Sequence, residues 1–441
     1  MYRAARALVI KPSKDQKLPA TAYDSPLEQI INHGVITETV YAGSDVDLSV
    51  IDVLPDVVIL DVGSALDPSV MSDYSKRLLS NKLSKVLPIV VVGSPNDFSL
   101  FDVNLHLNHR APAHVIAKKL KHLIRVNAMK IEYARRIETA RLFNVAAPAI
   151  ESLQSPSSER LLVVGKGERY FQLASIFNGS ATLKSAANFE EARTLFETHS
   201  FDCLIIDTLA YTNFDIDTLK QFKLDARYFT LPVLLLQEGL DTSEQEALVE
   251  TGICDLFDLH GEANEIVTHT KTLIQAEKLR SALLMAFKSR GFDKIRDKST
   301  NLPSNEFFER HLDKLVRQSQ AWKTPIAFGM LDVSVLFNTE TASDKQRQDG
   351  IFGQVGQTIA SLVRAEDIAT YRGDGKFIVA APNSSGLTIS VLIGRISAVL
   401  SMTEFSVGGL MGKVDVDTHY FDSKPEDSLV QIMESLTTAY A

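Results

Sequence analysis

Arg364 and Asp367 carry complementary hydrogen-bonding groups and stand three positions apart, between a predicted helix at 359–363 and a predicted strand at 368–371. A guanidinium can donate two hydrogen bonds to a phosphate or to the O6/N7 edge of guanine, and a carboxylate can accept from guanine N1–H and N2–H. The same spacing recurs by chance at Arg290/Asp293 and Arg310/Asp313. Only the pair at 364 and 367 directly precedes a predicted hairpin, which distinguishes it from the other two.

The predicted hairpin has apolar strands at 368–371 and 377–381, the second opening with Phe377. Gly373, Asp374 and Gly375 between them supply the positive-φ positions of a tight turn. Asp332 ends a predicted buried strand at 325–331 and could ligate Mg²⁺, but the ammonium of Lys376 in the hairpin repels that cation. We therefore expect neither a bound metal nor a catalytic residue.

At 441 residues the chain should hold about three domains. Apolar runs of the kind buried on both faces predict parallel sheets covered by helices, and this plan occurs twice, with Asp61 and Asp207 ending equivalent strands. The predicted division is 1–143, a linker at 144–158, 159–287 with a C-terminal helix, and 288–441. Lysines and arginines at 118–136 are interpreted as a solvated helix face.

The bulk composition favours a cytoplasmic protein. The net charge of −9 argues against a general nucleic-acid binder. No apolar run approaches the ~20 residues that a membrane span requires, and the N-terminus lacks the apolar core of a secretory signal. Cys203 and Cys254 lie in apolar strand-like runs, so we expect buried free thiols.

The two repeats resemble receiver domains of bacterial response regulators, of the flavodoxin-like (CheY-like) fold. The resemblance places Asp61 and Asp207 at the phospho-acceptor position. The acids that would hold Mg²⁺ are replaced by Lys11-Pro12 and Gly165-Lys166. We therefore expect these domains to act mainly as docking and dimerisation surfaces of a two-component type protein, with a homodimer formed through the receivers.

The last domain resembles the GGDEF (diguanylate cyclase) domain, and the domain order resembles the PleD type. The five signature positions read Gly373-Asp374-Gly375-Lys376-Phe377, so the catalytic acids are missing. Asp332 matches the first metal-binding aspartate, whereas the guanine-reading positions align with Glu340 and Thr341. These residues are interpreted as a vestigial active site.

Arg364 and Asp367 match the inhibitory RxxD site of this family, and Arg395 matches its secondary arginine. The resemblance implies binding of cyclic di-GMP, as an intercalated dimer, by a protein that no longer makes it. Degenerate members of this type further imply an adaptor recruited to the cell pole in cell-cycle-regulated proteolysis, with an RcdA-like adaptor, a CtrA-like substrate and the ClpXP protease as partners. Two alternatives stay open: an active or weak diguanylate cyclase, and a receiver scaffold that ignores nucleotide.

Overall fold

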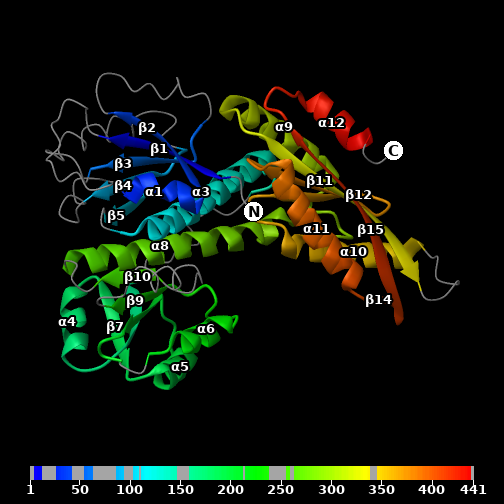
Figure 1. Ribbon diagram of the computed structural model, residues 1–441. Coiled ribbons are helices and arrows are strands. Elements are labelled where there is room, and N and C mark those ends of the chain that lie inside the picture. Colours follow the sequence, from blue (N-terminus) through cyan, green and yellow to red (C-terminus); the bar gives the residue numbers. More distant parts are fainter. Residues whose placement is uncertain are drawn as a thin grey trace.

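The computed structural model describes residues 4–11, 26–41, 54–62, 86–93, 103–108, 111–146, 158–211, 214–237, 255–258, 263–337 and 345–438. These residues form three five-stranded sheets with their helices (Figure 1). The predicted α/β class, with two parallel sheets ahead of a third domain, is confirmed. The guanine-reading positions 340 and 341, together with Pro12 and Cys254, lie outside the described residues.

The first sheet is parallel in the order β2-β1-β3-β4-β5. Its strands are β1 (Ala5–Lys11), β2 (Val35–Tyr41), β3 (Val57–Asp61), β4 (Ile89–Gly93) and β5 (Leu105–Asn108). Every residue of β3 and β4 is buried, as the continuous apolar runs predicted. One face of the sheet packs against α1 (Pro26–Gln29), the 3₁₀ turn η1 (Ile30–His33) and the start of α3 (Ala113–Arg141).

The second sheet repeats this plan in the order β10-β9-β8-β6-β7, again entirely parallel. Its strands are β6 (Glu159–Val164), β7 (Ala181–Ala186), β8 (Cys203–Asp207), β9 (Val233–Gln237) and β10 (Asp255–Asp258). The helices α5 (Phe189–Thr198) and α6 (Ile216–Leu224) cover one face, and α4 (Glu168–Ile176) with α8 (Ala263–Phe287) the other. Both sheets therefore have the 2-1-3-4-5 strand order of flavodoxin-like folds.

The third sheet is antiparallel, in the order β12-β13-β11-β15-β14. Its strands are β11 (Ile326–Phe337), β12 (Ile368–Gly373), β13 (Lys376–Pro382), β14 (Phe405–Val407) and β15 (Leu410–Ser423). The helices α9 (Asn305–Trp322) and α12 (Leu429–Thr438) pack on one face, and α10 (Lys345–Leu362) with α11 (Gly386–Met402) on the other. The short 3₁₀ segment η5 (Arg290–Ile295) joins α8 to this domain.

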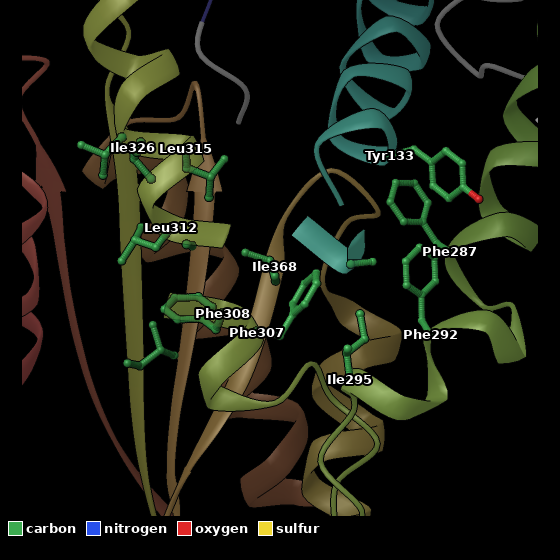
Figure 2. Close-up of a cluster of buried hydrophobic side chains, with 14 of the residues drawn as sticks. Tyr133, Phe287, Phe292, Ile295, Phe307, Phe308, Leu312, Leu315, Ile326 and Ile368 are labelled. Atoms are coloured by element: carbon green, nitrogen blue, oxygen red, sulfur yellow. The ribbon is translucent and has the colours of Figure 1, made fainter. Parts of the chain in front are cut away.

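The long helices α3 and α8 join the domains, because their C-terminal halves enter the core of the third domain (Figure 1). Tyr133 of α3 is fully buried, and its ring centroid lies 5.3 Å from that of Phe287 of α8. Figure 2 shows these rings beside Phe292, with Phe307 of α9 and Ile368 of β12 in the same cluster. The core of the third domain is therefore built partly from residues of the first two domains.

Two predictions made from the sequence are wrong in detail. The strand leading to Asp332 continues to Phe337, because β15 pairs with it along its whole length. The cations at 118–136 are not a uniformly solvated face, since Arg135 is 9% exposed and pairs with a buried glutamate.

Among the described residues, no helix combines the length and apolar character needed to cross a membrane. Cys203 is a buried free thiol, as expected.

Candidate functional site

The RxxD segment is the turn between α10 and β12. The Asp367 N–H donates to the Arg364 carbonyl oxygen at 3.1 Å, which closes the turn. Arg364 is half-buried, whereas Glu366 and Asp367 are only 8% and 3% exposed. Burial, reinforced by the adjacent Glu366 carboxyl, raises the pKa of Asp367 to about 8. In the ligand-free protein this acid is therefore mostly protonated at neutral pH.

The two acids of the turn each keep an unsatisfied oxygen. Oδ2 of Asp367 and Oε2 of Glu366 are buried and have no hydrogen-bond partner in the described part of the chain. Buried polar atoms are nearly always paired in folded proteins, so such orphans mark a site that a ligand or a rearrangement can satisfy.

Helix α3 of the first domain lies against this turn. Nη2 of Arg136 donates to the carbonyl oxygens of Asp367 at 2.6 Å and Ala365 at 3.3 Å. Nε of Arg125 lies 3.7 Å from Oε1 of Glu366. Two arginines of one helix thus contact the backbone and one side chain of the turn, which links the first domain to the candidate site.

A buried polar network holds α3 on α9. Oε1 of Glu132 accepts from Nε of Arg136 at 2.7 Å and lies 3.0 Å from Nε2 of His311. Nδ1 of His311 lies 3.1 Å from Oγ1 of Thr139. Arg135 bonds to both Glu132 and Gln318 of α9.

One carboxylate in this network faces two guanidinium groups. Burial alone would raise the pKa of Glu132, but His311, Arg136 and Arg135 outweigh it and hold that pKa at about 2. Burial lowers the pKa of His311, while Glu132 acts to raise it. An ionised Glu132 is thus shared between two guanidinium groups and His311, and these contacts fix α3 against the third domain.

The hairpin after the turn has the predicted form. Gly373, Asp374 and Gly375 have φ values of +94°, +49° and +78°. The Gly375 carbonyl accepts from the Val333 N–H at 3.0 Å, and a Cβ atom at Gly375 would lie 2.1 Å from the Val333 carbonyl oxygen. Phe377 is fully buried in the core. The turn therefore requires glycine at 375, where the family signature places an acid.

Asp332 stands between Lys376 of β13 and Asp417 of β15 in the sheet register. Directly opposed residues of antiparallel strands share one face, so the Lys376 ammonium and the Asp332 carboxylate are neighbours. Within the described residues there is no group of three histidine, cysteine or acidic side chains that could hold a metal ion. A lysine ammonium thus stands beside Asp332 in the sheet.

Arg395 belongs to the same region as the turn. It lies on the exposed side of α11, and its Nη2 donates to the Leu362 carbonyl oxygen at 2.8 Å. Leu362 ends α10, two residues before Arg364. The structure therefore brings all three predicted ligand-binding residues to one end of α10.

The predicted phospho-acceptors end their strands as expected but are largely inaccessible. Asp61 is 5% exposed at the end of β3, and Asp207 is 1% exposed at the end of β8. Oδ2 of Asp207 accepts from Nε of Arg169 at 2.6 Å, and Oδ1 accepts from the Leu209 and Ala210 N–H groups at 3.1 and 3.2 Å. One oxygen of the Asp207 carboxylate is thus already paired with a guanidinium.

Sequence reasoning missed Arg136, Glu132 and His311. A signal was present, because Glu132 with Arg135 and Arg136 has the i, i+3 and i, i+4 spacing of helical ion pairs. That spacing is equally typical of an exposed helix, and His311 lies far away in the sequence.

Comparisons with known proteins agree with this architecture. Residues 294–437 match the family model described as "Diguanylate cyclase, GGDEF domain". Over 368 residues the chain is 21% identical to the response regulator PleD of Caulobacter vibrioides, covering 80% of this chain and 79% of PleD. The third domain thus matches the GGDEF family model, and most of the chain is similar in sequence to PleD.

Two solved structures are similar to parts of the chain at low identity. One is the GGDEF domain of DgcB from Caulobacter crescentus in complex with c-di-GMP, 19% identical, with 33% of this chain and 85% of that chain covered and a TM-score of 0.30. Another is the diguanylate cyclase SiaD in complex with its activator SiaC from Pseudomonas aeruginosa, 15% identical, with 62% and 94% covered and a TM-score of 0.32.

Proposed function

We propose that this protein is a receptor for cyclic di-GMP that binds the dinucleotide at Arg364 and Asp367 without synthesising it. The observation that carries the proposal is the buried, unpartnered Oδ2 of Asp367. Guanine N1–H and N2–H groups are the donors that this carboxylate lacks. Arg364 and Arg395, at the same end of α10, supply the cations for two phosphates, and an intercalated dimer of the ligand would use both.

Loss of synthesis is supported by the vestigial active site. Joining two GTP molecules needs Mg²⁺ held by carboxylates, because the metal neutralises charge that develops on the phosphates. Here Lys376 is the cross-strand neighbour of Asp332, and Gly375 replaces an acid in a turn with no room for a side chain. The protein is in this proposal not an enzyme.

The contact of Arg136 with the turn supports a signalling role. A ligand that pairs with Asp367 and Arg364 changes the turn that α3 holds, and so biases how the first domain sits on the third. The ligand can shift that arrangement only by its difference in affinity for the two states. A coupling of about 1–3 kcal/mol is enough for a useful switch.

The downstream role rests on the resemblance to PopA-like proteins, the degenerate PleD-type receptors of cyclic di-GMP. By that resemblance the loaded protein is a cytoplasmic adaptor at the cell pole. It recruits an RcdA-like adaptor and a CtrA-like substrate for degradation by ClpXP, and a dimer forms through the receivers.

Calorimetric titration of the full chain with cyclic di-GMP tests the site. Arg364→Ala should weaken binding about 10-fold to 100-fold, because one charged hydrogen-bonding group is worth about 1.5–3 kcal/mol. Arg310→Ala is the matched control, since Arg310 belongs to another RxxD pair and is exposed on α9. Equal affinity in both variants would remove the site assignment.

Two further assays separate the alternatives. Incubation with GTP and Mg²⁺ should yield no dinucleotide, whereas an active diguanylate cyclase would accumulate it. Acetyl phosphate should leave Asp207 unlabelled, because Arg169 occupies its carboxylate. Labelling of Asp61 together with absence of cyclic di-GMP binding would favour a nucleotide-independent receiver scaffold.

A further inference from the structure

The outer edge of β15 is open over most of its length. The short strand β14 pairs only with residues 410–412 of β15. From Lys413 to Ser423 the strand pairs with β11 on one side alone. Long open edges expose unpaired N–H and C=O groups and invite another strand, so proteins normally shorten, bulge or cover them. This edge carries no proline, and its pairing with β11 shows no bulge.

The register of the hairpin shows which backbone groups point outward. Val407 and Leu410 flank the two-residue turn at Gly408-Gly409, whose φ values are +59° and +82°. Such a turn is closed by a hydrogen-bonded pair, so the even-numbered residues of β15 direct their backbone groups away from β11. The Val416 N–H agrees, since it donates to Oδ1 of Asp415 at 3.0 Å rather than to a strand. Within the described residues no backbone hydrogen bond reaches 414, 418, 420 or 422 from outside.

We propose that this edge pairs with the same edge of a second copy of the chain, antiparallel and about a two-fold axis at Thr418. In that register Asp417 of each copy lies opposite His419 of the other, and Val416 lies opposite Tyr420. An acid opposite a histidine and a β-branched residue opposite an aromatic are both favourable cross-strand pairs. Tyr420 is 55% exposed in the single chain.

Neighbouring registers are less favourable. Moving the axis one residue toward the N-terminus sets Asp417 against its own mate, and moving it two sets Asp415 against Asp417. Like charges directly opposite each other destabilise a sheet. The charge pattern therefore disfavours axes on the N-terminal side of Thr418, and the Asp417–His419 pair favours the axis at Thr418 with a second copy as the partner.

Helix α11 leaves room for this pairing. Arg395 reaches toward α10 through its bond to the Leu362 carbonyl, whereas Gly386 lies against Asp422 of β15. At 100° per residue these mark opposite sides of α11. Ile393 and Leu400 on the Gly386 side are buried in the core, and beside them runs a stripe of small residues, namely Ser390, Gly394, Ser397 and Ser401. Two copies of α11, lying above adjacent edge strands, could approach closely, because small residues reduce the interaxial distance.

Cross-linking of single cysteines in the full chain, with Cys203 and Cys254 replaced by alanine and no nucleotide added, tests the register. Thr418→Cys should form an intermolecular disulfide, since directly paired Cα atoms lie about 5.5 Å apart. Lys413→Cys is the control, because its symmetry mates would be roughly 34 Å apart. Cross-linking at 413 but not at 418 would overturn the proposal.

Sedimentation analysis of the nucleotide-free chain is the second test of the interface. Wild type should dimerise with rising concentration, and Thr418→Lys should weaken the dimer at least tenfold by opposing two ammonium groups. A chain that stays monomeric and uncross-linked at every concentration would refute the interface. So would a dimer that Thr418→Lys leaves unchanged, which would place dimerisation elsewhere, as in the receivers.

Discussion

Nη2 of Arg136 lies 2.6 Å from the carbonyl oxygen of Asp367, so a helix that belongs to the first sheet holds the candidate site of the third domain. The same guanidinium stacks over Phe287 at 4.6 Å and bonds to Glu132. One side chain thus joins the turn, the aromatic core and the buried charge network.

Replacing Arg136 with methionine should therefore destabilise the chain while preserving the aliphatic packing. The variant loses charged hydrogen bonds to Glu132 and two carbonyls, and we expect a cost of about 2–4 kcal/mol in thermal or urea denaturation. Arg141→Met, at the exposed end of the same helix, should change stability by less than about 0.5 kcal/mol. Equal stability of both variants would show that α3 does not depend on this contact.

Glu132→Gln tests the buried network. Without the carboxylate, Arg135 and Arg136 are left in the core without a counter-charge, and breaking such a pair costs about 3–5 kcal/mol. Glu138→Gln removes an exposed ion pair with Lys314 and should cost under about 1 kcal/mol. In wild type the contribution of Glu132 should be lost as the pH falls from about 4.5 through its folded pKa of about 2. Unfolding midpoints should be measured from pH 6 to pH 2 for wild type and Glu132→Gln. The difference between the two proteins should shrink as the pH falls.

Asp367 should make stability fall with rising pH. Its pKa is raised to about 8 in the folded chain, so folding favours the protonated acid. The stabilisation is complete below the unfolded pKa near 4 and is lost progressively as the pH rises to 8. Asp367→Asn cannot ionise, so its melting temperature should exceed that of wild type increasingly between pH 5 and pH 8. The melting temperature of Asp374→Asn, in the exposed hairpin turn, should change with pH as that of wild type does. If the melting temperature of Asp367→Asn also changed with pH as wild type does, the raised pKa of Asp367 would be contradicted.

The affinity for cyclic di-GMP should rise with pH, whereas the stability contributed by Asp367 falls with pH. If guanine N–H groups bond to the Asp367 carboxylate, the ligand binds the deprotonated protein, and binding releases a proton below pH 8. Affinity should then rise by up to about tenfold per pH unit between pH 6 and pH 8. Calorimetry in buffers of different ionisation enthalpy measures the released proton directly. A pH-independent affinity would show that Asp367 does not accept hydrogen bonds from the base.

Gly375 should resist restoration of the family signature. A Cβ at this position would lie 2.1 Å from the Val333 carbonyl oxygen, so Gly375→Ala must displace the backbone of β11. At Gly373 the positive φ penalises alanine but no atom lies within 4 Å. In thermal denaturation, the melting temperature of Gly375→Ala should therefore be lower than that of Gly373→Ala. The double variant Gly375→Glu/Lys376→Glu should make no dinucleotide from GTP, and product formation would show that the fold can still be reactivated.

The sequence predicted what short-range patterns control. The apolar runs that end at Asp61 and Asp207 identified β3 and β8, and the glycines of the turn identified the β12–β13 hairpin to within a residue or two. It also placed Arg364, Asp367 and Arg395 in one region. It did not predict the burial of Asp367 or the contact with Arg136, because both depend on where α3 lies in space. The contact between Glu132 and His311 likewise depends on how α3 packs against α9.

Helix α3 spans 29 residues, so it is a rod roughly 43 Å long. One end supplies Ile116 and Leu120 to the first core, and the other supplies Met129 and Tyr133 to the third. A fragment beginning near residue 288 would lack the part of α3 that packs on this core, and it would expose Phe307 and its neighbours to water. The core of the third domain is thus incomplete without α3. A change that displaces the first sheet would therefore reach the RxxD turn through α3.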